Sequence, residues 1–113
     1  MGIQAFAQMG NTVAVSVTNV ASTPVQVSSL TLGGNQYRLI NSGNVTVFLG
    51  YGAASANATT NAVIPTPGAG NSTFCLPLLA GTDEILSFVP NGYFSALTSS
   101  GTATIYITPG DGV

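Results

Sequence analysis

The stretch that decides the fold of this chain is residues 33–52, GGNQYRLINSGNVTVFLGYG. Residues 37–40 and 45–49 are rich in β-branched and aromatic side chains, which suit a pleated, half-buried surface. Residues 41–44 read as a turn between them, because Asn and Gly tolerate the positive φ that tight reversals require. The pattern therefore predicts a β-hairpin.

Arg38, in the first of these two strands, is the single Lys or Arg of the chain. A lone Arg in a nearly neutral chain needs a partner, and the carboxylates that could serve are Asp83, Glu84 and Asp111. We expect a structural ion pair or carbonyl contact in preference to a ligand contact. Because a ligand contact is the alternative, Arg38 is also included among the candidate interaction residues.

Working outward, the chain is a succession of short strand patterns separated by joints rich in Gly and Pro. Residues 12–18 alternate strictly, with Val13, Val15 and Val17 on one face. The strand that contains Pro77 belongs at an edge or ends early. Further strands are predicted at 25–32, 74–79, 84–89, 93–97 and 102–108, with the last two pairing across residues 99–101. No stretch has a sustained helical period.

These patterns predict a single all-β domain over residues 1–113, built as an antiparallel two-sheet sandwich. A jelly-roll or another Greek-key topology is expected, with a closed small barrel as the alternative. The order of the strands does not follow from the pattern.

Two segments stand apart from the strands and are the expected contact regions. Residues 1–10 form a candidate arm, in which residues 3–8 could be an edge strand of the domain or could reach a neighbour and add a strand to it. Residues 52–70 are rich in Ala, Ser, Asn, Thr, Pro and Gly and read as a long loop, with a short strand suggested at 62–64. The predicted interaction residues are Ile3, Phe6, Arg38, Tyr51, Val63 and Ile64.

The charged fraction is only 4%, against roughly 25% in an average soluble domain. The exterior must therefore consist of Ser, Thr, Asn, Gln, Gly and Ala. A formal net charge of -2 gives little repulsion between copies. We expect a surface that is covered by copies of itself, as a dimer or trimer, or by a larger assembly; the alternative is an exported, weakly charged surface protein.

The same composition excludes several partner classes. One Lys or Arg and no His leave no basic footprint for nucleic acid or for an anionic membrane. No apolar run reaches the ~18 residues of a membrane span. The first ten residues lack the basic and apolar regions of a secretory signal, so synthesis in the cytoplasm is expected.

Catalytic constellations are also absent from the sequence. Cys75 is the single cysteine, so no intrachain disulfide or thiolate metal cluster can form, and a buried structural thiol is expected. Asp83 and Glu84 are adjacent, so in a strand they would point to opposite faces. Without His there is no Ser-His-Asp set. We expect no enzyme, no catalytic residues, no cofactor and no metal.

Three phrases carry a resemblance to a known family: YRLINSG with VTVFLGYG at 37–52, LAGTDE at 79–84, and YFSALTSSG with IYITPGDG at 93–112. Together they resemble small structural proteins encoded beside the major capsid gene of tailed bacteriophages, over roughly residues 33–112. The resemblance implies a capsid decoration, or cement, protein with a jelly-roll-like fold.

Such a protein binds the outside of the virion shell where capsomers meet and stabilises the shell, acting as a dimer or trimer. The implied partner is the major capsid protein, the implied location is the capsid surface, and there are no catalytic residues to carry over. The alternative is a head- or tail-fibre module that binds host-surface glycans, in a groove with Tyr51, Tyr93 and Asn91 as candidates.

Overall fold

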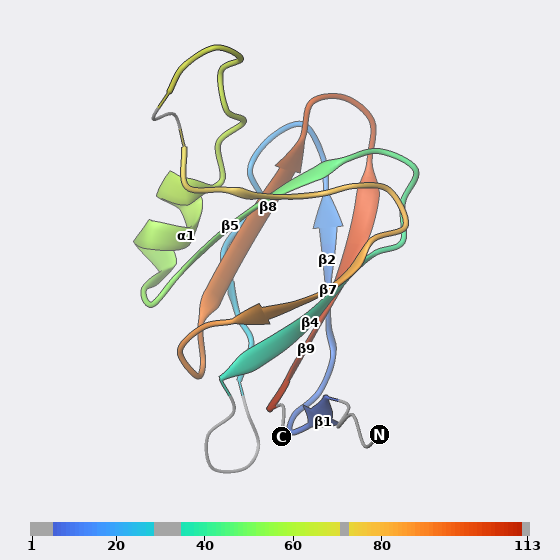
Figure 1. Ribbon diagram of the computed structural model, residues 1–113, viewed down its shortest axis with the longest axis vertical. Coiled ribbons are helices and arrows are strands. Elements are labelled where there is room, and N and C mark those ends of the chain that lie inside the picture. Colours follow the sequence, from blue (N-terminus) through green and yellow to red (C-terminus); the bar gives the residue numbers. More distant parts are fainter. Residues whose placement is uncertain (1–5, 29–34, 71–72, 112–113) are drawn as a thin grey trace.

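The computed structural model describes residues 6–28, 35–70 and 73–111, which form two antiparallel sheets packed face to face (Figure 1). The all-β sandwich is thus confirmed. Sheet A contains β1 (Ala7–Gln8), β2 (Val13–Val17), β9 (Ala103–Asp111), β4 (Gln36–Asn41) and β7 (Asp83–Ser87). Sheet B contains β3 (Val25–Gln26), β8 (Tyr93–Thr98), β5 (Val47–Gly52) and β6 (Leu76–Leu78).

The strand order can be described as one long antiparallel hairpin of paired strands that is wrapped into two sheets. Its pairs are β2 with β9, β3 with β8, β4 with β7, and β5 with β6. Rolling adds two further pairs, β4 with β9 and β5 with β8. The resulting orders, β2-β9-β4-β7 and β3-β8-β5-β6, are those of an eight-stranded jelly roll. β1 pairs with the end of β9 beyond β2.

The core lies between the two sheets and follows the alternation of each strand. Val15 and Val17 of β2 are buried as the sequence predicted, and Val13 is half-buried beside them. Tyr37 also points inward, and its ring meets that of Phe94 edge-on, with centroids 4.9 Å apart. Its hydroxyl donates to the Val89 carbonyl oxygen at 2.6 Å, so even this polar group is satisfied.

The predicted hairpin is wrong, because β4 and β5 belong to different sheets and do not pair. The chain crosses between the sheets after Asn41. The prediction that β8 pairs with β9 is wrong for the same reason. A hairpin and a sheet-to-sheet corner both direct the apolar face of each strand into one core, so alternation does not distinguish them.

Residues 52–70 contain a helix, α1 (Ser55–Asn61), which the sequence analysis missed, and the suggested strand at 62–64 is not present. A seven-residue helix is too short to show a period, and Ala58 is its one buried residue. Gly50 and Gly52 of β5 let α1 lie directly on the sheet: a Cβ on Gly50 would be 2.5 Å from the Ala58 carbonyl oxygen. Tertiary contact thus stabilises α1.

The candidate arm is partly a strand of the sandwich itself. Ala7 and Gln8 pair with Asp111 and Gly110 of β9, and the Met9 amide donates to the Pro109 carbonyl oxygen at 2.9 Å. Ala7 and Gln8 therefore form an edge strand of the sandwich, as one of the two alternatives for residues 3–8 predicted. Residues 1–5, and the strand expected over 30–32, lie outside the described residues. In the described part of the chain, no helix could cross a membrane.

Candidate interaction surfaces

The outer surface of sheet A is a broad, almost uncharged face, and Tyr106 lies on its central strand β9. Cross-strand register places Tyr106 between Ala14 of β2 and Ile40 of β4. Its side chain is 39% exposed. We call this surface the sheet A face; the side chains that β2, β4, β7 and β9 contribute to it are Ala14, Ser16, Gln36, Arg38, Ile40, Asp83, Ile85, Ser87, Thr104, Tyr106 and Thr108.

The charges on the sheet A face neutralise each other. The Arg38 guanidinium binds the Asp83 carboxylate through two bonds, Nε to Oδ1 at 3.0 Å and Nη2 to Oδ2 at 2.6 Å. The bond from Arg38 holds the pKa of Asp83 below its ordinary value, against partial desolvation, and the same bond raises the pKa of Arg38. The predicted structural ion pair is confirmed, with Asp83 as the partner.

Phe6 joins Arg38 on this face. Gln8 lies opposite Gly110 on the outer side of sheet A, so Phe6, two residues earlier, points the same way. A Cβ added to Gly110 would lie 2.8 Å from the Phe6 Cε1 atom, which shows that the ring covers Gly110. Two of the predicted interaction residues therefore share one surface, although they come from opposite parts of the chain.

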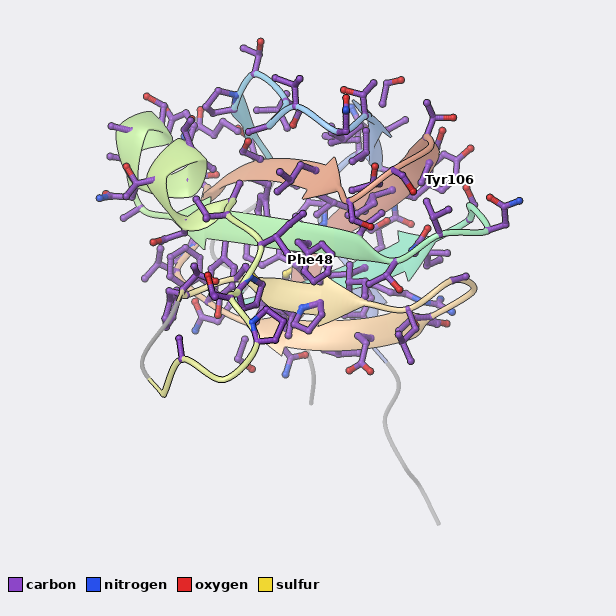
Figure 2. The ribbon with its side chains drawn as sticks, turned by 90° about the horizontal axis from the view of Figure 1, so that it is seen from above. Phe48 and Tyr106 are labelled. Atoms are coloured by element: carbon purple, nitrogen blue, oxygen red, sulfur yellow. The ribbon has the colours of Figure 1, made fainter. Side chains whose placement is uncertain are left out.

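The outer surface of sheet B is divided between α1 and an apolar row. α1 covers the part of β5 that contains Gly50 and Gly52. Beyond it, Phe48 lies between Leu97 of β8 and Pro77 of β6 and is half-buried. Figure 2 shows Phe48 near the centre of the view with α1 to its left. Helix and apolar row leave less free sheet here than on sheet A.

The remaining predicted interaction residues do not converge. Tyr51 points inward, and its ring lies 4.9 Å from that of Phe88, centroid to centroid. Val63 is 45% exposed and Ile64 is half-buried, both in the segment that follows α1. Ile3 lies outside the described residues. The structure thus separates this group into the sheet A face, the aromatic cluster around Tyr51 and the segment after α1.

The groove proposed for a glycan is not formed by the three residues named for it. Tyr51 lies opposite buried Phe94, whereas Tyr93 lies opposite Gly52 on the side of α1, so the two tyrosines point to opposite sides of sheet B. Asn91 lies in the turn before β8, with φ at 57°, and its carbonyl oxygen accepts from the Gln26 side chain at 3.1 Å.

Sequence reasoning missed Tyr106, which the structure places at the centre of the sheet A face. Its signal was present: in the run from Ala103 to Thr108 the apolar residues Ala103, Ile105 and Ile107 alternate with Thr104, Tyr106 and Thr108. Asn41 was also missed. Its side chain is fully buried and donates to the Leu78 carbonyl oxygen at 2.9 Å, which fastens the β4–β5 corner to the end of β6.

Reactive and metal-ligating groups are sparse on these surfaces. Among residues 6–28, 35–70 and 73–111, no three His, Cys, Asp or Glu side chains gather as metal ligands. Asp83 and Glu84 point to opposite sides of β7, as expected from their adjacency, because they lie opposite Ile40 and Leu39. Cys75 is only half-buried, in contrast to the buried thiol that the sequence predicts. The Thr73 hydroxyl lies 3.5 Å from its Sγ atom.

Comparison of the chain with protein-family models, with curated proteins and with solved structures found no match.

Proposed function

We propose that this chain is a virion structural protein that binds the outer surface of a bacteriophage capsid as a decoration, or cement, protein. The observation that carries the proposal is the sheet A face, a broad sheet surface in which the one ion pair is satisfied within the protein. The resemblance of residues 33–112 to small phage structural proteins supports the same class. Jelly rolls are also a common architecture of capsid domains.

The physical argument starts from desolvation. A charged face loses hydration when a partner covers it, and the loss is recovered only if each charge finds a matched partner. On the sheet A face Asp83 already accepts both bonds from Arg38, and the remaining side chains are hydroxyl, amide or apolar. A subunit can therefore cover this face without leaving an unmatched charge behind.

Tyr106 is the expected anchor of the contact. Tyrosine is enriched among the residues that dominate interface energies, because it combines a large apolar ring with a hydroxyl. The surrounding Thr104, Thr108 and Ser16 form a polar rim that can bond to backbone or water of a partner. The partner proposed for this face is the major capsid protein, and the proposed location is the capsid surface.

Stabilisation would then arise from bridging. A copy that contacts two neighbouring shell subunits makes their separation require the loss of both contacts together. Each contact needs to contribute only a few kcal/mol for many copies to resist expansion or rupture of the shell. No chemistry is required of the protein in this role.

The experiment uses phage heads assembled without this protein. Purified chain is added, binding is measured by co-sedimentation, its position on the shell is imaged by electron cryomicroscopy, and head rupture is followed during heating. We expect saturable binding to the outer surface and a higher rupture temperature. Heads that neither bind the chain at ~100 µM nor gain stability contradict the proposed function.

Two matched truncations locate the contact. Tyr106→Ala is expected to weaken binding by about 30-fold, equivalent to about 2 kcal/mol, because it removes the central ring of the face. Val63→Ala removes an exposed apolar side chain in the segment that follows α1 and should change binding by less than about threefold. The reverse ranking would move the contact to residues 52–70 and contradict the assignment to sheet A.

A second candidate function is the fibre module that binds host glycans. Its support is Phe74, which is 61% exposed and lies beside Tyr51 with ring centroids 5.5 Å apart. Aromatic rings of this kind could stack on a sugar, and jelly rolls also occur in lectins. Selective binding on a glycan array that Phe74→Ala abolishes would favour this function; an array without selective binding would count against it.

A further inference from the structure

β7 forms an open edge of sheet A, with β4 as its one neighbour among the described strands. Two backbone hydrogen bonds show which backbone groups of this strand bond to β4. The Asn41 amide donates to the Thr82 carbonyl oxygen at 3.0 Å, and the Phe88 amide donates to the Asn35 carbonyl oxygen at 2.8 Å. In an antiparallel pair, the residues whose backbone groups bond to the partner strand alternate along the strand. The backbone groups of residues 82, 84, 86 and 88 therefore point toward β4, and those of residues 83, 85 and 87 point away from β4, beyond the edge of the sheet.

Exposed apolar side chains gather on this side of the sandwich. Of the seven large hydrophobic side chains exposed in the described part of the chain, four lie between residues 74 and 89: Phe74 at 61%, Leu79 at 66%, Ile85 at 46% and Val89 at 45%. Ile85 lies within β7, and the other three flank β6 or β7, the two strands that end their sheets on this side. An edge with exposed apolar residues is a typical site for strand addition.

The neighbouring edge is protected and β7 is not. β6 contains Pro77, which has no amide hydrogen to donate and hinders strand addition. β7 contains no proline and offers outward donors at all of residues 83, 85 and 87. Its charged residues are Asp83, already bound to Arg38, and Glu84, so the arrangement of these acids decides which partner strand fits.

We propose that β7 pairs with β7 of a second copy, antiparallel, about a two-fold axis at Ile85. In this register Ile85 lies opposite Ile85 of the second copy, Asp83 lies opposite Ser87, and Glu84 lies opposite Leu86. All three outward-facing residues exchange backbone bonds, and the whole five-residue strand is paired. The strand is therefore complementary to itself.

The acids disfavour two of the alternative registers. A two-fold axis at Asp83 or at Glu84 would place each of these carboxylates opposite its own copy, and like charges directly opposite each other destabilise a strand pair. The axis at Ile85 places an exposed apolar side chain against its own copy and keeps every acid opposite a neutral residue.

The β7–β7 pairing does not depend on the proposed function, but it has a consequence for how the protein would bind the shell. The two-fold axis of an edge-to-edge strand pair is perpendicular to the sheet, so both sheet A faces lie on the same side. Two Tyr106 rings are then presented to one partner surface. If this face binds the shell as proposed, each dimer binds two sites at once, and the second contact forms at a high effective concentration.

Sedimentation velocity from about 1 µM to about 200 µM measures the association. We expect wild-type chain to reach twice the chain mass in this range. Ile85→Lys and Ile85→Glu should each remain monomeric, because residue 85 faces its own copy. An equimolar mixture of the two variants should restore the dimer, because Lys then faces Glu. Ser16→Lys, on the opposite edge strand β2, is the matched control and should dimerise as wild type does.

Three results would overturn the proposed pairing: a wild-type chain that stays monomeric at ~200 µM, a trimer, or Ile85 variants that dimerise unmixed. A mixture of folded Lys and Glu variants that stays monomeric would contradict the register, and far-ultraviolet circular dichroism checks the folding. Head binding by Ile85→Lys separates the two proposals: weakened but measurable binding keeps the shell function, and no binding by any form rejects that function while leaving the dimer standing.

Discussion

Replacing Asn41 by Ala should strongly destabilise the protein, because this buried amide bonds to backbone groups of two segments. The side chain is fully buried between the sheets. Its Nδ2 donates to the carbonyl oxygens of Val45 and Leu78 at 2.9 Å each, and its Oδ1 accepts from the Gly43 amide at 3.0 Å. These bonds close the β4–β5 corner and join it to the end of β6.

The magnitude follows from the groups left behind. Each neutral hydrogen bond contributes about 1 kcal/mol net, and a buried group left without a partner costs about 1–3 kcal/mol. Asn41→Ala removes three good bonds and leaves two carbonyl groups and one amide to find water. We therefore expect a loss of about 3 kcal/mol in the free energy of unfolding, a large share of the 5–15 kcal/mol typical of a domain.

Urea unfolding followed by circular dichroism measures this loss. With a slope of about 1.5 kcal/mol per molar urea, the midpoint should fall by about 2 M. Asn44→Ala is the matched control, because Asn44 is exposed in the same corner, and its midpoint should change by less than about 0.5 M. Equal effects of the two substitutions would refute the view that the buried amide holds the corner.

Two further predictions concern α1 and the ion pair. Gly50→Ala should cost about 2–3 kcal/mol, since the added methyl would meet the backbone of α1, whereas Gly70→Ala, where a Cβ meets nothing within 4 Å, should leave unfolding unchanged. Thermal unfolding of both variants checks this. Arg38 lowers the pKa of Asp83, so the stability that the pair contributes is present above the ordinary carboxyl pKa of about 3.9 and is lost as the pH falls through the folded-state pKa. The difference in stability between wild type and Asp83→Asn should therefore shrink from pH 6 toward about pH 2 in urea titrations; a constant difference would contradict the role of the pair.

Three of the strands, β2, β6 and β7, could be predicted from residues 12–18, 74–79 and 84–89. Alternation is a local property, and it marks which side of a strand is apolar wherever that strand is later placed. Pro77 likewise excludes a central strand from any arrangement, and the structure places it in edge strand β6. The all-β fold class could be predicted because the strand patterns, the turn residues and the lack of a sustained helical period all indicated the same class.

The candidate surfaces were less predictable. Alternation within β9 could have identified Tyr106 as an outward residue, but not that Phe6 and Arg38 share its face, because the three are distant in sequence. Three carboxylates were available to Arg38, and the β4–β7 register selected Asp83. α1 packs against β5 at Gly50 and Gly52, and this contact cannot be read from the sequence of the helix alone.

By itself, then, the amino-acid sequence determined an all-β chain of apolar and hydroxyl side chains with almost no charge. Only the tertiary structure decided that residues 37–49 cross between sheets instead of forming a hairpin, that α1 covers sheet B, and that β7 is left as an open edge. The physical reason is that a strand's pattern records one buried side, whereas its partners depend on backbone bonds to distant strands, which carry no side-chain signature.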